Sequence, residues 1–239
     1  MSMFSTIKFK LQAKSIRRLG LAVLAKLGVS FIFLALAKPA FAHHPFGGGT
    51  PSNFIEGFLS GLGHPVIGID HLTFVIAIGL MALLIRKLGF LLPVAFTLAA
   101  SVGAIIHLNS FNLPLVEPTI AFSVLAIGVL LAWQRKLSLA LLIVLSAIAG
   151  NFHGFAYGEA IFGAEMTPIS AYLLGFTSIQ LAISAIAFKL GRSTLVRLNN
   201  SDSNATSSQE ITYRSLPLRF AGFLITGVGI AFFSGSLIG

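Results

Sequence analysis

The chain has 239 residues, of which 56% are hydrophobic and only 10% are charged. Because soluble domains carry about 25% charged residues, this composition indicates a membrane protein. The absence of cysteine excludes disulfide bonds, thiolate zinc sites and thiol catalysis. Residues 1–42 hold seven of the 16 basic residues, which leaves nine basic against seven acidic residues in the remainder, so we expect no nucleic-acid partner.

Residues 1–42 have the pattern of a cleavable secretory signal peptide. A basic start precedes an apolar core at about 27–37, and the small-residue exit Ala40-Phe41-Ala42 follows. The alternative is an uncleaved first helix that acts as an anchor. Cleavage after Ala42 leaves His43 and His44 at the new amino terminus, where two imidazoles and a free amine can hold a divalent cation; otherwise this pair is simply solvated.

Residues 43–239 are expected to form a single all-α domain, a six-helix transmembrane bundle. A short, glycine-interrupted amphipathic segment around Phe54 to Leu62 comes first. Six apolar stretches follow, each near the ~20 residues that are needed to cross a bilayer. These stretches are predicted at about 66–85, 89–109, 115–133, 137–153, 168–190 and 218–238.

The loops between the predicted spans sort by charge. All Lys and Arg residues after position 42 fall in alternate loops, and the opposite loops carry only the acidic residues Glu117, Glu159 and Glu165. Positive residues stay on the cytoplasmic side. We therefore expect a multi-pass protein of the cell inner membrane, in contact with lipid, with both mature termini outside the cytoplasm. The polar stretch 192–217 is predicted to be a flexible cytoplasmic linker.

One run at the start of the first predicted span concentrates ionisable side chains. His64 lies just before the span, and Asp70 and His71 lie about 6–8 Å inside it, counting 1.5 Å per residue. A charge at mid-helix costs roughly 2.5–3.5 kcal/mol even on lenient insertion scales, so such residues usually handle ions, protons or chemistry. On the predicted topology, further groups reach the same outer depth: His107, Glu117, His153 and Glu159.

Imidazole and carboxylate ligands favour Ni²⁺, Co²⁺ or Zn²⁺ over Cu(I). His64 and His71 are seven residues apart, which is about 10.5 Å along a straight helix. They can share one ion only if the helix is broken between them, and Pro65 and Gly68 supply the means. Because neutral imidazole is the ligand form, binding is expected to weaken as the pH falls toward ~6.5.

Each of these residues also has a structural interpretation. The His64, Asp70 and His71 group can be a buried hydrogen-bonded network that locks helices together. Glu117 can cap a helix and favour its positive dipole end. His107 can be an interfacial residue that touches lipid head groups, and His153 can serve packing alone.

Three segments resemble the HupE/UreJ family, bacterial secondary permeases for nickel or cobalt. The first signature is carried by Gly57-Phe58, Gly61, His64-Pro65, Gly68 and Asp70-His71-Leu72. The second is carried by residues 152–159, and residues 116–123 are similar to the third-span segment. The resemblance implies a cleaved signal, a histidine-led mature start, six spans and an indirect link to hydrogenases, ureases and cobalamin synthesis.

Two positions depart from the family pattern. Glu159 follows Gly158 directly, where the family usually has one intervening residue, so Glu165 is a candidate substitute. Ala100 stands where the family has a histidine, and His107, two turns on, is the candidate to compensate.

The first functional hypothesis is therefore a nickel or cobalt permease without a prosthetic group. The ion is captured near the outer face and moves inward along polar groups, for which the candidates are Thr97, Ser101, Ser123, Ser146, Asn151, Thr177 and Gln180. The sequence lacks a Walker-type ATP motif, so a gradient, the membrane potential or intracellular trapping must drive transport. The alternative is an intramembrane zinc-dependent hydrolase that uses the same cluster. A third hypothesis is a scaffold or metal sensor.

Overall fold

The computed structural model describes residues 49–85, 88–134, 137–201 and 207–238. The predicted signal peptide, with His43 and His44, lies outside these residues. The described chain is helical and contains no strand, which confirms the all-α fold class. Five helices are long and apolar enough to cross a membrane, and a bent helix pair makes a sixth if it counts as one span.

The bent pair comes first and differs from the predicted single span 66–85. Helix α2 (Phe54–Ile67) ends at Gly68, whose backbone is extended, and α3 (Ile69–Met81) then leaves at an angle of 81°. Pro65 lies in the last turn of α2 and lacks a backbone N–H, which weakens the helix just before the break. Helix α2 begins at the cap residue Asn53, whose side chain accepts a hydrogen bond from the Glu56 backbone N–H at 3.0 Å.

Three further helices lie close to their predicted ranges. Helix α4 (Leu91–Leu108) and α5 (Val116–Trp133) match the second and third predicted spans. Helix α6 (Leu139–Gly158) begins after the cap residue Ser138 and continues into the short 3-10 helix η2 (Glu159–Ile161). The fourth span therefore ends five residues later than the predicted 153.

The last two helices are longer than the spans predicted for them. Helix α7 (Met166–Ser201) and α8 (Ser207–Ile238) extend into the stretch 192–217, which was expected to be a flexible linker. The helical parts of this stretch, 192–201 and 207–216, contain neither glycine nor proline, the two residues that most disfavour a helix. The linker prediction is wrong for these helical parts.

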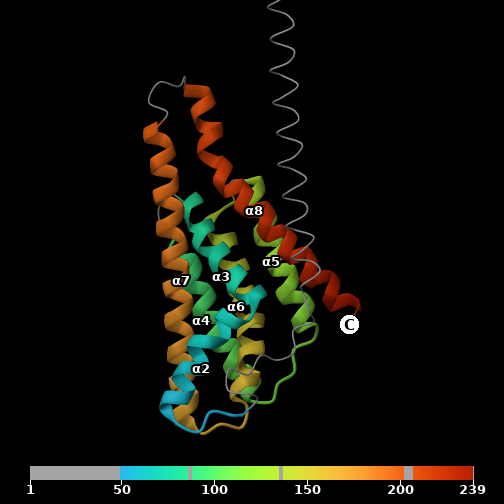
Figure 1. The fold of residues 1–239 in the computed structure, drawn as a ribbon. Helices are drawn as coiled ribbons and strands as arrows, with labels where there is room; N and C mark the ends of the chain where they lie inside the picture. The colour runs from blue at the N-terminus through green and yellow to red at the C-terminus, as the bar shows by residue number, and fades with distance from the viewer. Residues whose placement is uncertain (1–48, 86–87, 135–136, 202–206, 239) are drawn as a thin grey trace, which may run out of the picture. The chain divides into compact units, whose positions relative to one another are not determined.

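Helix α3, continued by the 3-10 turn η1 (Ala82–Leu84), runs between α7 and α5, and α2 lies along the first half of α7 (Figure 1). The pairs α4 with α6, α5 with α8 and α2 with α7 make the most extensive contacts. In α6, Gly150, Gly154 and Gly158 recur every fourth residue and meet α4. A Cβ atom on Gly154 would collide with the Ala100 backbone. This close approach is the small-residue packing typical of membrane helices.

Large apolar side chains also cover the outside of the bundle. Leu98, Phe122 and Leu174 are each more than half exposed, at 62%, 55% and 53%. Apolar residues on the outer surface of membrane-crossing helices indicate contact with lipid rather than water.

Candidate metal site

The break at Gly68 brings together the residues that a straight helix would separate. His64 lies in the last turn of α2 and His71 lies in the first turn of α3. The centroids of their imidazole rings are 6.1 Å apart. Both residues are buried, at 8% and 7% exposed, and Asp70 is 4% exposed. The condition that the helix be broken between the two histidines is therefore met.

His153 joins this group from α6. Its Nδ1 lies 2.8 Å from Nδ1 of His71, and its Nε2 lies 2.9 Å from Oγ of Ser123 on α5. His153 was expected at a helix end but lies five residues inside α6, where it is fully buried against the rings of Phe74 and Phe96. Three helices thus hold one imidazole pair.

The hydrogen-bond network assigns the protons of this pair. The Ser123 hydroxyl donates to the Ile120 carbonyl at 2.6 Å, so its oxygen accepts from the N–H at Nε2 of His153. Nδ1 of His153 is then unprotonated and accepts from the N–H at Nδ1 of His71. One proton then lies between two nitrogens that can otherwise bind a metal.

His64 is oriented by Tyr172 of α7. The Tyr172 hydroxyl donates to the Tyr157 carbonyl at 3.0 Å, so its oxygen accepts from Nδ1 of His64, also at 3.0 Å. A hydrogen bond of this kind fixes the orientation of an imidazole that binds a metal.

Tyr157 fills the space between the histidines. Its ring centroid lies 5.0 Å from that of His64 and 4.6 Å from that of His71. The side chain is fully buried, and its hydroxyl has no hydrogen-bond partner among the described residues. A buried hydroxyl without a partner beside two imidazoles is an oxygen donor for a bound ion or water.

Sequence reasoning assigned no role to Tyr157 or Tyr172. Tyrosine is scarce in this chain, with three in 239 residues. Tyr157 follows His153 by four residues and therefore lies on the same helix face. That spacing was the available signal for Tyr157, whereas the contact between Tyr172 and His64 depends on how α2 packs against α7.

The carboxylates lie at the same end of the bundle. Asp70 is buried at the start of α3, where its Oδ1 accepts the backbone N–H of His71 at 2.8 Å. Glu117, at the start of α5, is near enough to Asp70 and Glu159 for their charges to interact. Glu117, Glu159 and Glu165 are exposed. An acidic surface therefore adjoins the buried histidines.

His107 is placed differently from the other histidines. Its half-buried ring packs against Phe155 and Phe162, with centroid distances of 4.6 and 5.7 Å. Glu159 is close enough to interact with its charge. Ala100, for which His107 was the candidate to compensate, is buried in the apolar cluster with Tyr157 and Phe176. Positions 100 and 107 therefore have different surroundings.

No group of three or more His, Asp or Glu side chains in the described parts of the chain is arranged to hold a metal ion. The imidazole rings of His71 and His153 come nearest to such an arrangement. With metal–nitrogen bonds of about 2.0–2.1 Å, imidazoles at neighbouring corners of a tetragonal site are about 2.8–3.0 Å apart, against about 3.3 Å in a tetrahedral site. The observed 2.8 Å is the length of a hydrogen bond between the two rings, so both rings must turn before their nitrogens can bind a common ion.

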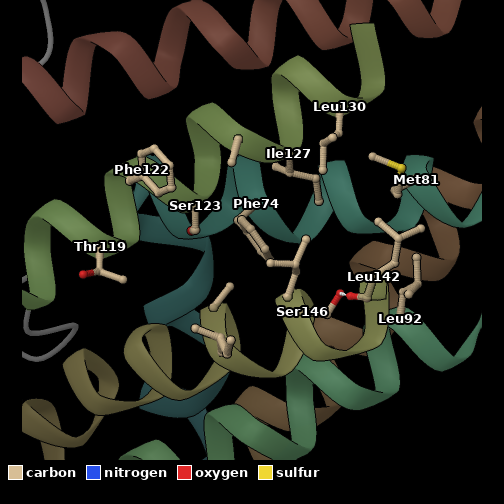
Figure 2. A pocket seen from close by; sticks show the side chains of 14 residues that line it. Phe74, Met81, Leu92, Thr119, Phe122, Ser123, Ile127, Leu130, Leu142 and Ser146 are labelled. Atoms are coloured by element: carbon tan, nitrogen blue, oxygen red, sulfur yellow. Dashed lines mark hydrogen bonds between the residues drawn. The ribbon is translucent and has the colours of Figure 1, made fainter. Parts of the chain in front are cut away.

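A cavity of about 140 Å³ adjoins the pair on the side of α5 and α6 (Figure 2). Figure 2 shows Phe74, Thr119, Ser123 and Ser146 at its wall, among mostly apolar side chains. The hydroxyls of Ser123 and Ser146 already donate to backbone carbonyls. This wall offers little to replace the water around a divalent ion, so it does not support Ser146 as a step on the ion path.

Comparison with known proteins agrees with the resemblance noted in the sequence. The family described as HupE / UreJ protein matches residues 31–232. Protein HupE of Rhizobium leguminosarum bv. viciae is 31% identical over 157 residues, which cover 65% of this chain and 78% of that protein. No solved structure matches the chain.

Proposed function

We propose, because the chain belongs to the HupE/UreJ family, that it is a secondary permease for nickel or cobalt. The association of this family with nickel and cobalt transport supports a metal permease in general, and it favours a transporter over an enzyme. The observation that supports the finer proposal is the buried, hydrogen-bonded pair of His71 and His153, in which Nε2 of His153 is also bonded to Ser123 of a third helix, α5.

Capture begins at the acidic surface. Asp70, Glu117 and Glu159 lie in one region, and a divalent cation relieves the repulsion between their charges. The ion then exchanges water for the nitrogens of His71 and His153. Entry displaces the proton that the two Nδ1 atoms share, so binding releases a proton or moves it to another ring nitrogen. His64 and Tyr157 stand beside this pair as further donors.

The expected orientation places this site near the outside of the cell inner membrane, with both mature termini on that side. His43 and His44 would then precede the site as a first capture point, and His107 would stand at its rim. The membrane potential adds about 2.3 kcal/mol per charge per 100 mV, or about 4.6 kcal/mol for a divalent ion. The delivered metal would supply metalloenzyme maturation only indirectly.

Nickel suits the pair because imidazole nitrogen is a ligand that Ni²⁺ prefers. Cobalt uses the same ligand types. The zinc hydrolase requires three protein ligands and an open position, and the described residues provide no such group of His, Asp and Glu side chains. No observation therefore favours the hydrolase.

Uptake of radioactive nickel and cobalt by cells tests the proposal. Asp70→Asn and His71→Ala should each reduce uptake at least tenfold, because each removes a buried group beside the imidazole pair. His107→Ala is the matched histidine control and should have a smaller effect, since its ring packs against Phe155 and Phe162. Comparison of uptake by Glu159→Gln with uptake by Glu165→Gln decides which of these two carboxylates takes part in metal capture. Normal uptake by both Asp70→Asn and His71→Ala would disprove the permease proposal for this site.

A further inference from the structure

Gln180, in the middle of α7, has a buried polar atom that the fold leaves unused. The side chain is fully buried, and its Nε2 donates to the Phe176 carbonyl at 3.1 Å. Its Oε1 has no hydrogen-bond partner among the described residues. An unsatisfied buried acceptor destabilises the fold, and lipid offers no water to satisfy it. Leucine would fill the same space without this cost.

Gln180 continues the helix face that begins at the histidine cluster. Tyr172, Phe176, Gln180 and Ser184 follow one another at intervals of four residues, so they lie on one face of α7. All four are buried, and Tyr172 bonds to His64. Gln180 is eight residues beyond Tyr172, which is about 12 Å along the helix axis.

Helix α4 contacts α7 and supplies a second buried oxygen. Phe176 packs in one apolar cluster with Ala100, and Ser184 lines the same cavity as Pro93. On α7, Gln180 lies between Phe176 and Ser184. On α4, Thr97 lies between Pro93 and Ala100. Thr97 follows Pro93 by four residues, is 2% exposed, and donates its hydroxyl proton to the Pro93 carbonyl at 2.8 Å. Its oxygen lone pairs can still bind a cation.

One turn beyond Gln180 the bundle opens into a cavity of about 810 Å³. Gly79, Pro93 and Ser184 line it, and Arg192 and Val196 lie further along α7 at its wall. Ser184 is 3% exposed and donates to the Val75 carbonyl at 3.1 Å. The layer of Gln180 and Thr97 therefore separates the buried histidines from a large open space.

We infer that Oε1 of Gln180, with the Thr97 hydroxyl, forms an inner oxygen site through which the divalent cation passes from the histidine pair to this cavity. The inference rests on the proposed function. Neutral oxygen donors bind Ni²⁺ and Co²⁺ more weakly than imidazole does, so the site accepts the ion and also releases it. Lys189 and Arg192 at the cavity are exposed, and at physiological ionic strength their field is screened within about 8 Å.

Gln180→Leu tests the inference because it removes the unused oxygen and keeps the volume. Equilibrium binding of nickel or cobalt by the purified full chain should stay within twofold of wild type, because the histidine pair is intact. Uptake by cells should fall at least tenfold. Ser178→Ala, on the exposed face of α7, is the control and should leave both binding and uptake unchanged.

Gln180→Glu gives a readout that does not depend on transport. A carboxylate at this position should hold the ion, so the purified protein should bind one more equivalent of metal than wild type. Wild-type uptake by Gln180→Leu would overturn the inference. Loss of metal binding together with uptake would also overturn it, because Gln180 would then belong to the histidine site.

If Gln180→Leu does not accumulate, Gln180→Met is judged by the same criteria. Failure of the permease proposal is separately visible, since Asp70→Asn and His71→Ala would then transport normally whatever the behaviour of the Gln180 variants.

Discussion

Ser123→Ala should weaken metal binding although Ser123 need not touch the metal. In the structure its oxygen accepts the N–H at Nε2 of His153, and this bond keeps the proton away from Nδ1. Without the hydroxyl, His153 either keeps an unpaired buried N–H or moves its proton to Nδ1. The second outcome places two N–H groups against each other at the contact with His71 and removes the nitrogen that would bind the ion.

The size of the effect follows from either outcome. A buried donor left without a partner costs about 1–3 kcal/mol. Groups that orient a metal-binding histidine typically change metal affinity about 10–100-fold when they are removed. We therefore expect the dissociation constant for nickel or cobalt to rise about 10–100-fold, which corresponds to about 1.4–2.7 kcal/mol.

Competition with a metal chelator, using the purified protein, measures this constant directly. Ser178→Ala is the matched control because the Ser178 hydroxyl makes the same kind of bond to a backbone carbonyl, at 2.8 Å, but is exposed. Ser123→Thr keeps the hydroxyl and should bind metal more tightly than Ser123→Ala does. If Ser123→Ala and Ser178→Ala bind metal equally well, the tautomer assignment is wrong.

Two glycine substitutions separate the metal site from the fold. Gly68 has φ −74°, which any residue adopts, yet a Cβ atom there would lie 2.6 Å from the His71 ring. Gly68→Ala should therefore leave the amount of folded protein near normal while metal affinity falls about tenfold; unchanged affinity would show that the ring has room to move. Gly154→Val should instead reduce folded protein in the membrane, because its side chain collides with the backbone of α4 and overpacking costs about 1–3 kcal/mol or more. Normal accumulation and thermal stability would contradict that contact.

Hydrophobicity alone located most of the helices. The stretches 89–109 and 115–133 differ from α4 and α5 by at most two residues at either end, because the length of an apolar run is set by bilayer thickness. The polar ends were less predictable. Helix α7 continues to Ser201, well past its apolar part, since polar residues without glycine or proline can extend a helix into water.

The proximity of the buried ionisable residues was predictable from the sequence but the way their atoms meet was not, and their role as metal ligands stays a prediction. Asp70, His71 and His153 are conspicuous because ionisable side chains are rare in apolar helices, and the structure does bring them together. The roles of Ser123 and Tyr172 depend on which atoms meet across helices and on where single protons lie. No spacing along one helix contains that information.

The incomplete character of the site favours a transported ion over a resident one. A structural metal is held by a closed shell of protein ligands and leaves slowly. Here the histidine contacts are one imidazole pair that shares a proton, with His64 and Tyr157 beside it. The proton competes with the cation for the same nitrogens, so occupancy depends on the local concentrations of both. We propose that this competition lets the site bind its ion strongly enough to select it and weakly enough to release it, as a carrier requires.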